Sequence, residues 1–434
     1  MGHDYYLCVG QGKKETFSLP PNWVATHFLE SETGEILSSA GQMATDALDH
    51  PAGRGLDELL APGKGKKIAV IVDDGTRPTP VREILEILLA RIEGAGFSRE
   101  NIAIVIALGT HGRMNGEALE TKLGRDVVSR YPVVQHDAWG KDLVPVRVPG
   151  YETPARINPA VAQAEVKIGI SSVLPHPMAG YGGGPKILMP GVCDADFLTR
   201  HHMSQTIHPL SRAGLAKGNP FHEACMKIAQ TIGLDFSINC VYNKEGQLAR
   251  IVAGGLQDAY SRAVEVCLEK LGHRFDEKVD VTITSTYPHT HGIQFCKGLA
   301  APDAITRDAG AVLVVAPLVT PLLKDFLGAF GAIREKSHDR SKPYVTGIMS
   351  EGRLFLPDNS PEFNMAVYSI VRRPAIRTII VSPLISPDDA SSMGMEHAVS
   401  VEEGLRILER SYPRAEVAIF PSGGLVVPIT AWEQ

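Results

Sequence analysis

The sequence predicts an α/β protein of two domains, each a mainly parallel sheet with flanking helices. Short, almost wholly apolar runs occur at residues 67–72, 102–108 and 166–173, and polar or glycine residues flank them, as is usual for buried parallel strands. An amphipathic stretch at 81–95 separates the first two runs, and the pattern restarts with a strand at 279–285. Alternating strands and helices are typical of three-layer α/β folds.

The length of the chain sets the number of domains that we expect. A chain of 434 residues is long enough for roughly two or three domains. We place a boundary near residue 275, so that residues 1–275 form an N-terminal domain and residues 276–407 a C-terminal domain. The tail at 408–434 could return to the first domain.

Composition excludes several classes of protein. The chain is 44% hydrophobic and 21% charged, which is ordinary for a globular protein with an ample core. The net charge of −6 argues against a nucleic-acid or anionic-membrane partner. No apolar run reaches the roughly 18 residues of a membrane-spanning helix, and the polar start is no signal peptide. The six cysteines lack CxxC spacing, so we expect reduced thiols in a cytoplasmic protein.

The expected elements alternate along the N-terminal domain. Strands are expected there at 4–9, 15–19, 67–72, 102–108, 131–135, 144–148, 166–173, 236–242 and 248–253. Helices are expected at 81–95, 115–123, 221–232 and 257–271. In the C-terminal part, strands are expected at 279–285, 311–316, 344–349, 378–381 and 417–420, with a helix-like segment at 304–309.

Polar side chains follow three of these strands. Asp74 and Arg77 come after the strand at 67–72, His111 after the next strand, and His176 after the strand at 166–173. Because the carboxyl ends of parallel strands meet at one edge of a sheet, we expect these groups to converge on a site in the cleft between the domains. A histidine there suits acid–base chemistry. Alternatively, Asp74 and Arg77 cap a helix or pair with each other.

The stretch from Ser171 to His202 is rich in glycine, proline and histidine. Its Gly182-Gly183-Gly184 run precedes Lys186, and its amides could bind an anion, although no phosphate-loop motif is present. The amine of Lys186 could form a covalent adduct or contact a phosphate. The alternative is a tight loop whose histidines cap neighbouring elements.

These motifs together resemble those of the lactate racemase family. The resemblance is carried by DDGTRPTP at 73–80, ALGTHG at 107–112, LPHPMAGYGGGPKILMPGV at 174–192 and the later His202. Gln294-x-x-Lys297 and Gly423-Gly424 also have family counterparts, so the resemblance covers most of the chain. It implies a nickel-pincer nucleotide, a pyridinium-derived cofactor whose sulfur-containing arms grip the metal, bound by the N-terminal domain.

The resemblance also implies a role for each matching residue. Lys186 would hold the cofactor through a thioamide link, His202 would bind nickel, and His111 and His176 would be the acid–base pair. The loop of Asp74, Gly75, Thr76 and Arg77 would contact cofactor and substrate, as Pro190 would contact the cofactor. Arg77, Gln294 and Lys297 would bind the substrate, Arg77 and Lys297 being suited to a carboxylate.

The implied activity is that of a racemase or epimerase inverting C2 of a 2-hydroxy acid. The hydride on C2 would be transferred to the cofactor ring, which gives a 2-keto acid. It would then return to the opposite face of C2. One histidine would serve each face. The implied partners are a small-molecule 2-hydroxy acid and the cofactor-synthesis enzymes, with a homodimer left open.

The sequence departs from the family pattern at the substrate end. Ile293 stands where an aromatic residue is expected, Gly112 stands where arginine is common, and the loop before Ile293 carries His289 and His291. We therefore expect a substrate other than lactate. Alternative readings are an oxidoreductase that releases the keto acid and a non-catalytic cofactor carrier. A zinc hydrolase built on the site histidines is disfavoured, because no acidic ligand lies at metal spacing.

Overall fold

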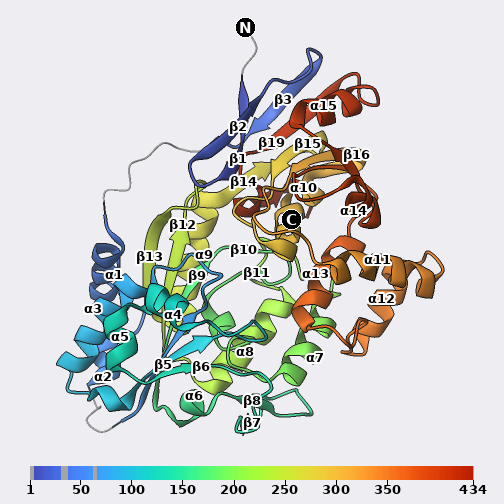
Figure 1. Cartoon of the computed structure of the whole chain (residues 1–434). Coiled ribbons are helices and arrows are strands. Elements are labelled where there is room, and N and C mark those ends of the chain that lie inside the picture. The colour runs from blue at the N-terminus through green and yellow to red at the C-terminus, as the bar shows by residue number, and fades with distance from the viewer. Residues whose placement is uncertain (1–3, 31–37, 62–65, 434) are drawn as a thin grey trace.

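A computed structural model describes residues 4–30, 38–61 and 66–433, and it is built on two six-stranded sheets (Figure 1). The first sheet has the order β13-β12-β9-β4-β5-β6. Its strands are β13 (Leu248–Gly255), β12 (Phe236–Tyr242), β9 (Val166–Val173), β4 (Ile68–Asp73), β5 (Ile102–Ala107) and β6 (Val133–Gln135). Only β13 pairs antiparallel, with β12.

The second sheet is parallel throughout and has the order β18-β17-β16-β15-β19-β3. Its strands are β18 (Glu396–Ala398), β17 (Arg377–Val381), β16 (Thr306–Val315), β15 (Val279–Ser285), β19 (Ala415–Phe420) and β3 (Trp23–Phe28). The expected α/β class, with mainly parallel sheets and flanking helices, is confirmed.

Helices cover both faces of the first sheet because its strands are apolar on both sides. Alternate residues of β4, such as Val70 and Ile71, lie in different core clusters. On one face pack α1 (Ala40–Asp49) and α3 (Val81–Gly94), and on the other α8 (Pro220–Ile232) and α9 (Leu256–Leu271). Such two-sided burial explains why these strands read as continuous apolar runs.

The second sheet is covered in the same way. On one face lies α15 (Val401–Glu409), packed with residues of the β1 (Tyr5–Gly10) and β2 (Lys13–Phe17) hairpin. On the other lie α10 (Ala300–Ile305) and α11 (Lys324–Ser337). The remaining helices of this half are α12 (Ser341–Ser350), α13 (Pro361–Val371) and α14 (Pro387–Ser392).

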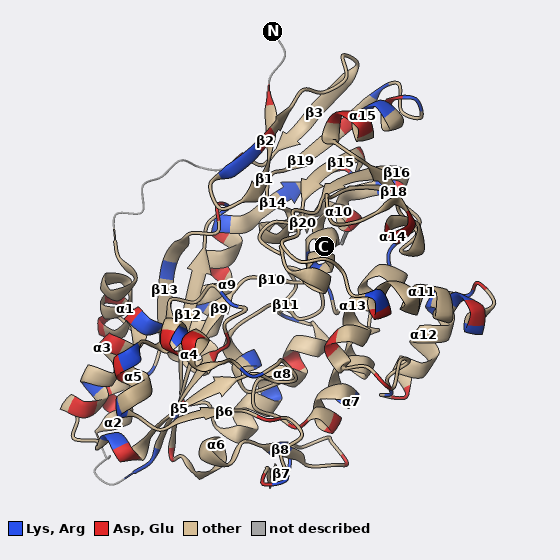
Figure 2. Cartoon of the chain, in the orientation of Figure 1, with Lys and Arg blue, Asp and Glu red and all other residues tan. Residues whose placement is uncertain are grey.

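Short elements complete the fold. The helices among them are α2 (Leu56–Leu60), α4 (Gly116–Leu123), α5 (Arg125–Arg130), α6 (Pro159–Gln163) and α7 (Ala195–Thr206). The strands form three pairs: β7 (Val144–Val146) with β8 (Ala155–Ile157), β10 (Pro175–His176) with β11 (Gly180–Tyr181), and β14 (Gly272–Phe275) with β20 (Val427–Thr430). Basic and acidic residues are interspersed along the outer helices (Figure 2). Within the described ranges, no helix is long and apolar enough to cross a membrane.

Two expected elements are wrong. Residues 344–349 were expected to be a strand but belong to helix α12, where Val345 and Met349 are buried one helical turn apart. Residues 304–309 were expected to be helical, but α10 ends at Ile305 and β16 begins at Thr306. The division at residue 275 remains a prediction. Strands β3 and β19, from opposite ends of the chain, pair with each other in the second sheet.

Candidate active site

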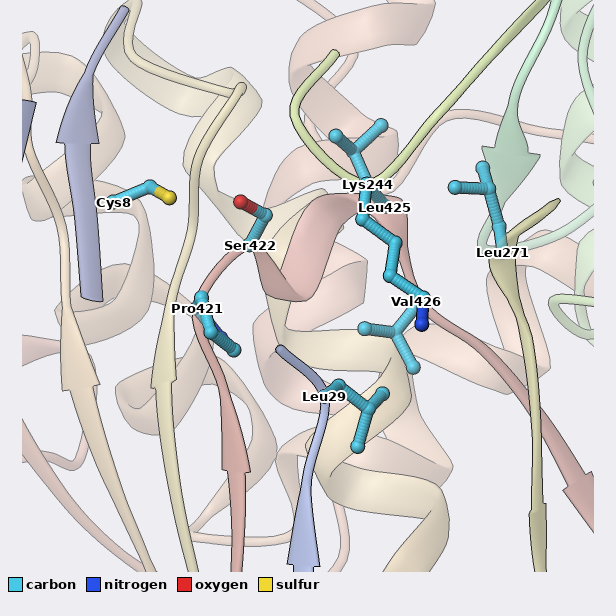
Figure 3. Close-up of a pocket in the computed structure, with 8 residues that line it drawn as sticks. All are labelled: Cys8, Leu29, Lys244, Leu271, Pro421, Ser422, Leu425 and Val426. Carbon is cyan, nitrogen blue, oxygen red and sulfur yellow. The ribbon is translucent and has the colours of Figure 1, made fainter. Parts of the chain in front are cut away.

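A cavity of about 680 Å³ lies where the carboxyl ends of the first sheet face α13 and the segment η3 (Gly292–Leu299). All the site residues expected from the sequence line it: Asp74, Gly75, Thr76, Arg77, His111, His176, Lys186, Pro190, His202, Gln294 and Lys297. A second hollow, between Cys8, Lys244 and Leu425 (Figure 3), measures about 10 Å³ and has room for no more than a water molecule. The larger cavity is therefore the candidate active site.

The loop after β4 is ordered by Asp74. Its carboxylate accepts hydrogen bonds from the backbone nitrogen of Thr76, at 2.7 Å, and from Nδ1 of His111, also at 2.7 Å. Burial opposes ionisation, but the hydrogen bond and charge of His111 and the charge of Arg77 hold the pKa of Asp74 below its usual value. Arg77 donates to the hydroxyl of Thr76 at 2.8 Å, which leaves its guanidinium on the cavity wall.

His111 lies between two carboxylates. Besides Asp74 on Nδ1, Glu362 lies 3.3 Å from Nε2 through its Oε2 atom. Burial would lower the pKa of His111, but these hydrogen bonds and charges outweigh burial and raise the pKa to about 9. His111 is therefore a cation at neutral pH.

His176, in contrast to His111, is uncharged at neutral pH. Its Nδ1 atom accepts hydrogen bonds from the backbone nitrogens of Met178, at 3.3 Å, and Ala179, at 3.1 Å. Burial and the charges of Lys186 and Lys297 hold the pKa of His176 well below its usual value. The neutral ring consequently carries its proton on Nε2 and can donate to a substrate oxygen. Taking up a proton would require the ring to turn away from the two amides.

The glycine run serves close packing before Lys186. At Gly183, with φ of +70°, a Cβ atom would lie 2.8 Å from the carbonyl oxygen of Ser172, and at Gly184 it would lie 2.1 Å from the ring of Tyr260. The run therefore lies directly against β9 and α9. This places Lys186 with its amine 4.9 Å from the ring centre of Phe221. Burial lowers the pKa of Lys186 to about 8, so about a tenth of the amine is neutral and nucleophilic at pH 7.

The ring of His202 is oriented by the helix that carries it. Its Nδ1 atom donates to the carbonyl of Leu198, one turn earlier in α7, at 3.1 Å. The proton is thereby fixed on Nδ1, and Nε2 keeps a lone pair, which is the usual arrangement of ligating histidines. Among residues 4–30, 38–61 and 66–433 there is no group of three or more His, Cys, Asp or Glu side chains that could hold a metal ion by themselves.

The second half of the molecule contributes Lys297 and two histidines to the cavity. Burial and the nearby charge of Arg77 lower the pKa of Lys297 to about 7. Burial and the charges of Lys297 and Arg77 lower the pKa of His289 to about 3, so His289 is neutral. His289 and His291 both line the cavity.

Comparison with known proteins bears on this arrangement. Residues 10–214 match the model of the lactate racemase N-terminal domain. The chain is 28% identical over 427 residues to lactate racemase of Thermoanaerobacterium thermosaccharolyticum, covering 95% of this chain and 96% of that protein. It is 27% identical over 420 residues to lactate racemase of Lactiplantibacillus plantarum, covering 92% of this chain and 95% of that one. The chain is therefore similar to lactate racemases over nearly its whole length.

The fold agrees with this similarity in sequence. The solved lactate racemase apoprotein from T. thermosaccharolyticum superposes with a TM-score of 0.86 at 24% identity, covering 98% of this chain and all of that one. A second solved structure, of a Thermotoga maritima protein, gives a TM-score of 0.56 at 16% identity. Since both curated relatives are racemases and match nearly the whole chain, the protein is an enzyme of the isomerase class.

Glu362 is the residue of the site that the motifs did not reveal. It lies in the first turn of α13, and its carboxylate accepts from Gln294 Nε2 as well as facing His111. Because α13 was not expected from the sequence, nothing indicated that Glu362 would lie against His111.

Proposed function

We propose that this protein inverts C2 of a 2-hydroxy acid by reversible hydride transfer through a 2-keto acid, using a nickel-pincer nucleotide attached to Lys186. One observation carries the proposal: the expected lysine, metal-binding histidine, histidine pair and carboxylate-binding cations all line one cavity. When bound, the cofactor would supply an electrophilic ring carbon that takes up hydride and returns it.

The cofactor end of the cavity fits this group. The partly neutral amine of Lys186 suits the covalent link, and the Nε2 lone pair of His202 suits nickel. Pro190 and residues Asp74 to Arg77 form the adjoining wall.

Arg77 and Lys297 would bind the substrate carboxylate, with Gln294 beside them. A carboxylate between the two cations would restore the charge of the Lys297 amine, whose pKa their mutual repulsion helps to lower. Binding of the acid and protonation of Lys297 would then be coupled.

His111 and His176 would exchange protons with the C2 oxygen, one for each enantiomer. A racemase needs one such group protonated and the other unprotonated at the start of each turnover. The protonated state of His111 and the neutral state of His176 support this assignment of one acid and one base. His176 would accept a proton after its ring turns from the amides of Met178 and Ala179.

The substrate proposed here is not lactate itself. Ile293 lines the cavity where the family pattern has an aromatic residue, and the neutral His289 adds a hydrogen-bonding group to the wall. Both features suit a larger or more polar tail than a methyl group. The proposal also makes the cofactor-synthesis enzymes necessary partners.

The decisive experiment is the intact mass of protein produced together with the cofactor-synthesis enzymes and nickel. We expect a mass adduct that maps to Lys186, is absent from Lys186→Ala, and persists in a control, Lys227→Ala, on the exposed face of α8. The loaded protein should then destroy the optical purity of a 2-hydroxy acid in a panel containing lactate, 2-hydroxybutanoate and malate. An unmodified Lys186 would refute the cofactor assignment, and accumulation of a keto acid would favour an oxidoreductase.

A further inference from the structure

Glu362 joins two parts of the proposed site that come from different segments of the chain. One of its carboxylate oxygens, Oε2, lies 3.3 Å from Nε2 of His111, which follows β5. The other oxygen, Oε1, accepts a hydrogen bond from Nε2 of Gln294 in η3. A single side chain therefore connects the expected acid–base residue to an expected substrate-binding residue.

The position of Glu362 is fixed by the helix that carries it. Ser360 caps α13 by accepting from the backbone nitrogen of Phe363 at 3.2 Å, so Glu362 lies in the first turn, where a negative charge is favoured. Phe363 and Val367 of this helix are buried in the core. The carboxylate is consequently presented to the cavity from a rigid element.

The contact with His111 competes with proton transfer. The ring has only two nitrogens, and Asp74 already holds Nδ1 at 2.7 Å. A group that gives a proton to a substrate oxygen, or takes one from it, must present its remaining nitrogen to that oxygen. The carboxylate of Glu362 contacts this nitrogen, Nε2. A substrate oxygen must therefore displace Glu362 before it can exchange a proton with His111.

We infer that Glu362 is a positioning residue for the acid–base step: it orients His111 and Gln294 by binding one nitrogen of each, holds His111 in its protonated form, and yields Nε2 to the C2 oxygen of the substrate. The charged groups around the ring agree with this role. Asp74 and Arg77 face it from the loop after β4, Lys297 lies on η3, and Glu362 lies on α13. Of the two carboxylates, only Glu362 lies on the nitrogen left for the substrate.

The catalytic part of this inference rests on the proposed racemisation, whereas the charge of His111 can be measured without it. The first readout is therefore the titration of His111 by NMR in cofactor-free protein with ¹³C-labelled histidine, its signal identified by loss in His111→Asn. In the wild type we expect titration near 9. In Glu362→Gln, which keeps the shape but not the charge, we expect the titration to fall by about one pH unit or more.

Two variants serve as controls. Glu362→Asp retains the charge and should keep His111 titrating above Glu362→Gln. Glu335→Gln removes an exposed carboxylate from α11 and should leave the titration unchanged. Equal titration of His111 in the wild type and in Glu362→Gln would overturn the inference.

The second readout is the pH profile of kcat/KM for racemisation of L-2-hydroxybutanoate by the cofactor-loaded enzyme. The transition of this pH profile that is due to titration of His111 should move to lower pH in Glu362→Gln, by the same amount as the NMR titration. A transition that stays in place while the NMR titration moves would also overturn the inference. No turnover by any variant would contradict the proposed function for this acid, and the NMR titration would then decide the role of Glu362.

Discussion

Gly184 illustrates how single residues place the lysine of the site. Its φ of +50° is in the left-handed region, and a Cβ atom there would meet the buried ring of Tyr260 at 2.1 Å. Because a side chain is disfavoured at this φ and the ring of Tyr260 is buried, we expect Gly184→Ala to lower the free energy of unfolding by about 3 kcal/mol or more. Urea denaturation of the cofactor-free protein measures this loss.

Gly218→Ala is the matched control for that substitution. Gly218 also has a positive φ, of +78°, but a Cβ atom there would meet nothing within 4 Å. Its loss should be limited to the backbone strain, about 1 kcal/mol. Equal losses at the two positions would show that the contact with Tyr260 contributes nothing.

The site was largely predictable at the scale of residues, because its members belong to ordered motifs. Lys186, His202, His111 and His176 were singled out from such motifs, and all four line the cavity. The reason for the glycines was not predictable. Their spacing indicated a close approach but not its partner, which the structure identifies as β9 and Tyr260.

Helix α11 carries two glycines that its packing does not require. Gly328 and Gly331 are exposed, have ordinary helical φ values, and would place a Cβ atom within 4 Å of nothing. Since glycine is a poor helix former, Gly328→Ala and Gly331→Ala should each raise the free energy of unfolding by about 0.5–1 kcal/mol. Urea denaturation of each variant tests this.

The same substitution in α15 should have the opposite sign. A Cβ atom on Gly404 would lie 2.4 Å from Cδ1 of the buried Leu313 in β16. Gly404→Ala should therefore destabilise the protein, because the helix would have to move away from the sheet. If Gly404→Ala raised the free energy of unfolding as much as Gly328→Ala, helix propensity alone would govern the effect in both helices.

Strands were easier to predict than helices, for a physical reason. Buried parallel strands such as β4, β5 and β9 are continuous apolar runs with polar ends, which few other elements imitate. Short amphipathic helices lack so distinct a pattern. The apolar run in α12 reads equally well as a strand, and it is helical because Val345 and Met349 share one face against the core.

At the scale of the whole molecule, no local pattern in the sequence indicated that β3 would pair with β19. Strand β3, near the start of the chain, extends the second sheet beside β19, with Trp23 opposite Ala415 (Figure 1). Pairing of this kind depends on the completed sheet edge and not on any local pattern. The same limit applies to Glu362, which reaches His111 only because the two halves face each other across the cavity.

The buried histidines make the stability of the whole molecule depend on pH. Burial is the main cause that lowers the pKa of His222 to about 4 and of His289 to about 3, and it holds the pKa of His176 well below 6.5. Below pH 6.5 the unfolded chain binds protons at these positions and the folded protein does not, so stability must fall as pH falls. His111 acts in a different window. Its raised pKa contributes stability that is fully present below 6.5 and is lost as pH rises through about 9.

We therefore expect the free energy of unfolding of the cofactor-free protein to fall between pH 6.5 and pH 5.0 by at least about 1.7 kcal/mol, which is the contribution of one histidine that stays neutral. Urea denaturation at the two pH values measures the loss. His222→Gln should reduce it, because that position then binds no proton in the unfolded chain. His50→Gln should not, since His50 is exposed, with 78% of its side chain accessible. If both substitutions left the loss unchanged, the acid sensitivity would have to come from groups other than His222, and burial of its ring would carry no linkage to folding.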